Sequence, residues 1–166
     1  MIKKIINVIS TLFSILLIGI VLIFIGLNLM GIKPFIVLSG SMEPNIHTGS
    51  ICFIDTNFQY ENIEKNDVIA FKAANGVLVT HRVINISEDG METKGDNNEV
   101  SDGISTTKEN FEGKNLFSIP YLGYISQFIQ TTKGKIICVT TFICLTLISF
   151  MFSDEKKENI SKSENE

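Results

Sequence analysis

Two serines and one histidine carry the most specific chemistry that this sequence offers. The segment 38–44, LSGSMEP, holds hydroxyl groups at Ser39 and Ser41 with a glycine between them. A serine hydroxyl attacks a carbonyl poorly until a base removes its proton, and histidine is a common base of this kind. His81 is the candidate base, since it lies in the β-rich run 77–86. By itself a histidine on an apolar strand face is more often a core residue than a catalyst.

A histidine base usually needs a carboxylate that fixes its tautomer and stabilises its charged form. The acidic loop 94–102, KGDNNEVSD, offers Asp96 and Asp102. Most acidic loops are only solvated turns, and a Ser-Gly-Ser stretch is common in loops. The occurrence of all three features in one small domain favours nucleophilic catalysis where no single feature would.

The composition indicates a membrane protein. The chain has 166 residues, of which 45% are apolar and 19% are charged, and its mean hydropathy is +0.26. The apolar excess is concentrated in two blocks, 5–32 and 136–153. The net charge of -4 gives no reason to propose a nucleic-acid partner. The sequence has no CxxC pair and no His/Cys cluster, so we expect no structural zinc site.

The first apolar block is expected to be a retained anchor, covering residues 1–32. As a helix it would be about 42 Å long, more than the ~30 Å of a bilayer core, and it is too long for the apolar region of a cleaved signal peptide. The second block, 136–153, is short, since a helix over 136–152 would extend only about 26 Å. It is therefore either a short transmembrane helix or a buried hairpin helix.

The basic residues near the two ends predict the topology. Lysines precede the first block and follow the second, which favours a cytoplasmic location for both termini. We therefore expect a multi-pass protein of the cell membrane, with residues 33–135 forming an extracytoplasmic domain and residues 154–166 a charged cytoplasmic tail.

The region between the two blocks is expected to be mostly β-structure. The runs 49–55, 67–72, 77–86 and 91–94 suit strands, and Asn75-Gly76 predicts a two-residue hairpin turn between the second and third. Side chains alternate along a strand, so His81 shares a face with Val79 and Val83 while Arg82 points the other way. We expect Arg82 to bind an acidic loop residue. The apolar stripe in 121–128 predicts a turn or helix at the membrane surface.

Three of these segments resemble, in the same order, the serine, histidine and aspartate boxes of type I signal peptidases. They are SGSMEP at 39–44, THRV at 80–83 and TKGDNN at 93–98. The histidine stands where most bacterial members carry a lysine, so the sequence resembles the branch shared by archaea, the endoplasmic-reticulum complex and some Gram-positive bacteria. IPYLGY at 119–124 also resembles that branch, whereas 105–118 matches poorly.

The resemblance implies a small antiparallel β catalytic domain, mainly β in class, flanked by two transmembrane helices. It implies a signal peptidase I, a serine endopeptidase that removes N-terminal signal peptides from secreted preproteins at the outer membrane surface. It also implies that no cofactor is required. Ser41 would be the nucleophile, with the Ser39 hydroxyl and the Ser41 N–H forming the oxyanion hole. His81 would be the general base, Asp102 would orient it, and Asp96 would support the loop.

The expected partners are signal-peptide-bearing preproteins and the lipid bilayer, and the need for accessory subunits is left open. Two alternatives remain at this point. One is a serine-lysine peptidase in which Lys72 is the base. The other is a non-enzymatic two-span membrane adaptor whose β domain binds a partner.

Overall fold

The structure, a computed structural model, describes residues 2–144 and 146. The chain divides into two compact units. One comprises Met1–Ile25 with Phe128–Glu166, and the other comprises Gly26–Gln127. The predicted limits of the outer domain, 33–135, remain a prediction.

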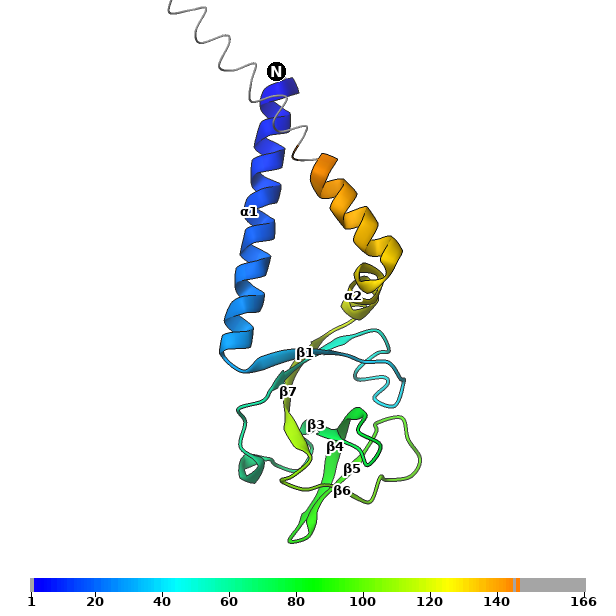
Figure 1. Cartoon of the computed structure of the whole chain (residues 1–166). Helices are drawn as coiled ribbons and strands as arrows, with labels where there is room; N and C mark the ends of the chain where they lie inside the picture. The colour runs from blue at the N-terminus through cyan, green and yellow to red at the C-terminus, as the bar shows by residue number, and fades with distance from the viewer. Residues whose placement is uncertain (1, 145, 147–166) are drawn as a thin grey trace, which may run out of the picture. The chain divides into compact units, whose positions relative to one another are not determined.

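Helix α1, Ile2–Leu29, dominates the described part of the first unit (Figure 1). Its stretch Thr11–Leu29 is long and apolar enough to cross a membrane, and it is the one such stretch found among the described residues. The chain is also helical over residues 132–144. The predicted second span covers 136–153, and of it the structure describes 136–144 and residue 146. The tail 154–166 lies outside the described residues, and a second transmembrane helix stays a prediction.

The second unit is built on one antiparallel sheet of seven strands, which confirms the mainly β class. The strands are hydrogen-bonded side by side in the order β1-β2-β7-β3-β4-β5-β6. Their bounds are Ile32–Ile36 (β1), Ile51–Asp55 (β2), Val68–Lys72 (β3), Leu78–Ser87 (β4), Gly90–Lys94 (β5), Ile104–Thr106 (β6) and Phe111–Ile119 (β7). The unit also contains a short 3-10 helix, Tyr60–Asn62 (η1), and the first two-thirds of helix α2, Leu122–Gln130.

The predicted hairpin between 67–72 and 77–86 is present as β3 and β4, but its turn differs from the expected one. A hydrogen bond of 2.9 Å from Ala73 N–H to the Val77 carbonyl closes a three-residue loop. Gly76 has a φ of 77°, whereas Asn75 does not have a positive φ. The Asn75 side chain instead accepts a hydrogen bond from Val77 N–H at 3.1 Å. A three-residue loop with one left-handed residue also fits the strand twist, and the expectation of a two-residue turn was wrong.

Strand β7 lies in the middle of the sheet although its sequence matched the family poorly. It pairs with β2 on one side and with β3 on the other. A Cβ atom at Gly113 would lie 2.2 Å from the carbonyl oxygen of Asp55, so only glycine fits this crossing. Long-range pairing therefore defines this strand, which has no regular alternation of its own.

Two apolar clusters hold the segments that carry the candidate residues. One includes Met42 and Ile46 of the segment after Ser41, and the other includes Phe71, whose ring contacts that of His81. Full burial of one large apolar side chain contributes about 1.5–3 kcal/mol to the stability of the fold. Both clusters therefore hold these segments in place. The clusters are Met42, Ile46, Cys52, Ile54 and Ala70, and Ile63, Ile69, Phe71, Val83 and Met91.

Candidate active site

Ser41 lies in the connection between β1 and β2, which is closed at its base by two backbone hydrogen bonds. Val37 N–H donates to the Ser50 carbonyl at 2.9 Å, and Gly49 N–H donates to the Val37 carbonyl at 2.8 Å. Met42, directly after the serine, is 1% exposed. The buried neighbour and the closed base fix the backbone on which the Ser41 hydroxyl is carried.

His81 lies on β4 and is almost buried, with 7% of the residue exposed. The predicted alternation holds here, because Val83 on the same face is fully buried. The edge of the His81 ring packs against Phe71, with ring centroids 6.4 Å apart and planes at 67°. A ring held in this way has little freedom to turn.

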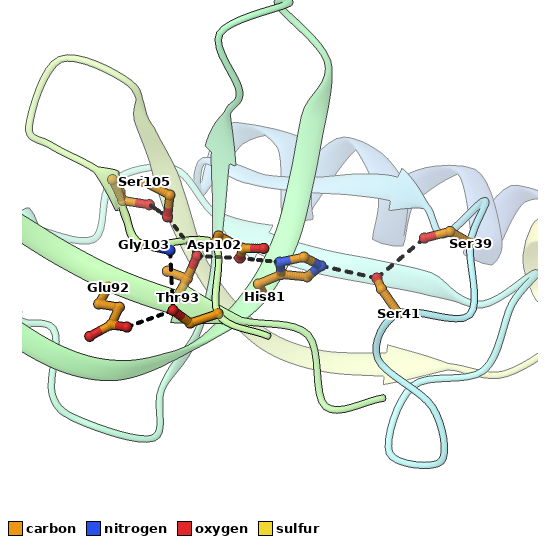
Figure 2. Close-up of polar contacts among 10 residues, drawn as sticks. Ser39, Ser41, His81, Glu92, Thr93, Asp102, Gly103 and Ser105 are labelled. Carbon is orange, nitrogen blue, oxygen red and sulfur yellow. Dashed lines mark hydrogen bonds and ion pairs between the residues drawn. The ribbon is translucent and has the colours of Figure 1, made fainter. Parts of the chain in front are cut away.

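The structure brings Ser41, His81 and Asp102 into one hydrogen-bonded row (Figure 2). His81 Nε2 lies 3.0 Å from Ser41 Oγ. His81 Nδ1 lies 2.5 Å from Asp102 Oδ2. An ionised carboxylate only accepts hydrogen bonds, so the proton of the neutral ring is on Nδ1 and Nε2 is left to accept the Ser41 proton. We refer to these three residues as the Ser41–His81–Asp102 row.

Asp96, the second candidate carboxylate, has different partners. Arg82 Nε donates to its Oδ1 at 2.8 Å, and Arg82 Nη2 donates to its Oδ2 at 2.6 Å. Asn45 Nδ2 also donates to Oδ2 at 2.8 Å. The hydrogen bonds from Arg82 hold the pKa of Asp96 below its ordinary value, and those from Asp96 raise the pKa of Arg82. The prediction that Arg82 binds an acidic loop residue is confirmed.

The Asp96 end of the loop also contacts the backbone of the candidate nucleophile. Asn97 N–H donates to the Ser41 carbonyl at 2.8 Å. A Cβ atom at Gly95 would lie 2.6 Å from the same carbonyl oxygen. Glycine at position 95 therefore permits the loop to approach the main chain of Ser41 closely.

Ser39 lies beside the candidate nucleophile, with its Oγ 3.2 Å from Ser41 Oγ. Among the described residues, the Ser41 N–H donates no backbone hydrogen bond. A hydroxyl and an unpaired N–H therefore lie near Ser41 Oγ, and both are donors suited to a developing oxyanion.

Lys72 and His47 do not join the row. The Lys72 ammonium forms an ion pair with Glu112 on β7. Within the described part of the chain, the hydroxyl of Ser41 has Ser39 and His81 as its hydrogen-bond partners. His47 instead stacks on Tyr121, with centroids 6.1 Å apart. The geometry thus pairs Ser41 with a histidine and gives no support to a lysine base.

A groove of about 570 Å³ opens beside Ser41 and His81. Residues 35–39 form one wall and residues 77–81 the other. The pairing of β4 with β5 begins only at Arg82, so the preceding part of β4 has one unpaired edge. An unpaired edge is suited to receive an extended peptide. Among the described residues no group of three His, Cys, Asp or Glu side chains could hold a metal ion.

Comparison with known proteins identifies the family. The family model described as "Signal peptidase, peptidase S26" matches residues 6–115. The chain belongs to the signal peptidase family. It is 34% identical over 119 residues to signal peptidase I W of Bacillus subtilis (strain 168), a match that covers 65% of this chain and 63% of that protein. It is 36% identical over 104 residues to the signal peptidase complex catalytic subunit SEC11C of Homo sapiens, covering 55% of this chain and 54% of that protein.

These relatives confirm the resemblance to the type I signal peptidases of the endoplasmic-reticulum and archaeal branch. The matched part covers less than two thirds of the length of either relative. The activity of the whole protein, its substrates and its partners are therefore treated as proposals below.

Three residues near the site were not among the predicted site residues. Asn45 and Asn97 hold Asp96 and Ser41, and Thr93 contacts Asp102. All three lie in or next to the segments that resemble the family, and this position was the only feature of the sequence that could have pointed to them. Their partners lie far away in the sequence or beyond the end of a strand, so the spacing of residues along the sequence could not predict these contacts.

Proposed function

We propose that this signal peptidase is a membrane-bound serine endopeptidase that removes N-terminal signal peptides from secreted preproteins. The observation that carries the proposal is the Ser41–His81–Asp102 row, with separations of 3.0 and 2.5 Å. Nucleophile, base and orienting carboxylate within hydrogen-bond reach are the signature of acyl transfer by an activated serine.

In the proposed reaction, Ser41 Oγ attacks the scissile carbonyl carbon while His81 Nε2 takes the hydroxyl proton. Asp102 stabilises the imidazolium that forms. His81 then donates this proton to the leaving amine, which departs as the new N-terminus of the mature protein. Water, deprotonated by His81, hydrolyses the acyl-enzyme ester and frees the signal peptide.

Ser39 and the Ser41 N–H are proposed to stabilise the oxyanion of both tetrahedral intermediates. The Ser39 hydroxyl is 3.2 Å from Ser41 Oγ, so a modest rotation directs it to an oxygen on the attacked carbon. One such donor is typically worth about 3 kcal/mol of the barrier.

The groove beside Ser41 is proposed to take the end of the signal peptide as an extended strand. Main-chain pairing with the open edge of 77–81 would supply affinity, and the apolar walls would supply selectivity for small side chains at the -1 and -3 positions. These walls include Phe35, Val37, Leu78 and Val79.

The proposed location is the cell membrane, with the catalytic unit on the extracytoplasmic side. The apolar stretch Thr11–Leu29 of α1 supports an N-terminal anchor. A second anchor over 136–153 would make the protein multi-pass. The human relative is named as the catalytic subunit of a complex. Whether this chain needs accessory subunits is therefore tested by asking whether it cleaves a precursor alone.

The test is cleavage of a signal-peptide-bearing precursor by the full chain in detergent or in lipid vesicles, followed by mass analysis of the new N-terminus. Wild type should cleave, and Ser41→Ala and His81→Ala should not. Ser118→Ala is a matched control, because Ser118 lies on β7 and pairs with Cys52. Undiminished cleavage by folded Ser41→Ala would reject the nucleophile and favour the adaptor alternative.

A further inference from the structure

A buried hydroxyl lies directly behind the Ser41–His81–Asp102 row. Thr93, on β5, is 0% exposed. Its Oγ1 lies 2.8 Å from Asp102 Oδ2 and 2.6 Å from Ser105 Oγ (Figure 2). The oxygen of Asp102 that faces His81 is thus the same oxygen that faces Thr93.

The charge on Asp102 determines which way the protons in this network point. An ionised carboxylate has no proton to give, so the Thr93 hydroxyl must donate to it. Thr93 has only one proton, so the short contact with Ser105 requires the Ser105 hydroxyl to donate to Thr93. The donors therefore run in one direction from Ser105 to Thr93 to Asp102, and His81 Nδ1–H meets the same carboxylate oxygen from the other side.

The backbone ties the same two residues together. Asp102 N–H donates to the Thr93 carbonyl at 2.9 Å, and Thr93 N–H donates to the Gly103 carbonyl at 3.4 Å. Next to them, Ser101 Oγ donates to Glu92 Oε1 on β5 at 2.6 Å. The backbone bonds fix where Asp102 lies, but the carboxylate could still rotate about its side-chain bonds. The Thr93 hydroxyl is the contact that restrains this rotation from β5.

We propose that Thr93 is a positioning residue that holds Asp102 Oδ2 in line with His81 Nδ1, and that Ser105 fixes the direction of the Thr93 hydroxyl. The inference rests on the proposed peptidase function and deepens it. Thr93 does not touch the substrate; it acts through Asp102 on the orientation of the His81 ring.

A second buried threonine provides a matched comparison. Thr106, on β6, is also 0% exposed. Its Oγ1 lies 3.5 Å from Ser105 Oγ, and its carbonyl accepts a hydrogen bond from the Tyr60 hydroxyl. No contact joins its side chain to Asp102 among the described residues. Replacing either threonine by valine removes a buried hydroxyl of the same size, but only Thr93→Val removes a donor to the carboxylate.

The experiment measures kcat, KM and melting temperature for precursor cleavage by the full chain in detergent. A hydrogen bond to a charged group corresponds to roughly a 10-fold to 100-fold effect. Thr93→Val should lower kcat by about that factor and leave KM within about twofold. Thr93→Ser, which keeps the donor, should restore kcat to within about threefold of wild type. Ser105→Ala should give a smaller loss than Thr93→Val, and Thr106→Val should keep the wild-type kcat.

The inference is overturned by a wild-type kcat in Thr93→Val, by an equal loss in Thr106→Val, or by a Thr93→Ser variant as slow as Thr93→Val. If Thr93→Val does not fold, the pair Thr93→Ala and Thr93→Ser carries the same comparison. Failure of the proposed function has a separate signature, namely a wild type that does not cleave or a Ser41→Ala variant that does.

Discussion

The two ends of the loop between β5 and β6 carry the same side chain in opposite settings. Asp96 is held by an arginine and an asparagine, and its side chain is 10% exposed. Asp102 is held by a histidine and a threonine, and its side chain is 25% exposed. Arginine stays charged at every accessible pH, whereas histidine gains and loses a proton near neutrality.

This difference shows how one loop can provide both an anchor and a chemical group. The permanent pair of Asp96 with Arg82 holds the loop, and the neighbouring Asn97 N–H holds the carbonyl of Ser41. The partner of Asp102 can change its charge during a reaction. We therefore expect substitutions at the Asp102 end to affect turnover, and substitutions at the Asp96 end to affect stability and the position of Ser41.

The largest expected effect comes from breaking the row itself. Ser41→Ala and His81→Ala should each lower kcat by about 10⁴-fold to 10⁶-fold, because the two groups act as one unit. The double variant should be no slower than either single variant, which measurement of all three residual rates will check. Multiplicative losses would show that the two residues act independently.

The next effect comes from pushing the loop away from the nucleophile. Gly95→Ala introduces a Cβ 2.6 Å from the Ser41 carbonyl oxygen, so the loop or the serine must move. A displacement near 1 Å can lower the rate by about 10²-fold, so we expect a loss of that order in kcat. Gly26→Ala is the control, since its Cβ would meet nothing within 4 Å. Equal rates for the two variants would mean that the close approach does not position Ser41.

Asp96→Asn should affect stability more than turnover. Loss of hydrogen bonds between charged groups should lower the free energy of unfolding by about 1.5–3 kcal/mol at neutral pH. The folded-state pKa of Asp96 lies below its ordinary 3.8, so its contribution is complete above that pH and is lost as the pH falls through the lowered pKa.

The check on Asp96→Asn is thermal unfolding from neutral pH down to pH 3. The gap in melting temperature between wild type and variant should narrow as the pH falls below 3.8. A gap that stays constant over this range would contradict the ion-pair explanation.

The smallest expected effect is that of Lys72→Ala. Its ion pair with Glu112 is 58% exposed on the lysine side, and exposed pairs contribute about 0–1 kcal/mol. We expect kcat within about twofold of wild type when precursor cleavage is measured. A loss comparable to that of His81→Ala would instead favour the serine-lysine alternative.

Local patterns were sufficient to predict the hairpin that carries His81. The β-branched runs gave β3 and β4, and their alternation put His81 on the buried face beside Val83. The contact of His81 with Asp102 agrees with the assignment that the family resemblance favoured, and the ion pair of Arg82 with Asp96 agrees with the expectation that Arg82 binds an acidic loop residue. The catalytic roles of these residues remain predictions.

Features that depend on distant pairing were not predictable. Strand β7 has a glycine and a lysine in its middle, and only its neighbours β2 and β3 define it. The Thr93 contact was missed for a similar reason, because a single threonine in a strand does not reveal which group its hydroxyl meets. Gly76 has the positive φ that a hairpin turn with glycine predicts, but a two-residue and a three-residue loop both place a glycine with positive φ there.

We expect Asp102 to orient His81 for catalysis, and Asp96 to hold the loop in place through Arg82. The most direct measurement is single-turnover cleavage of a signal-peptide-bearing precursor by Asp102→Asn and Asp96→Asn, with the melting temperature of each. We expect Asp102→Asn to lose about 10³-fold to 10⁴-fold in rate, because an amide cannot fix the same tautomer, and to keep a melting temperature near that of wild type. Asp96→Asn should lose stability and retain most of its rate. A folded Asp96→Asn variant that is inactive, together with an active Asp102→Asn variant, would show that Asp96 and not Asp102 orients His81.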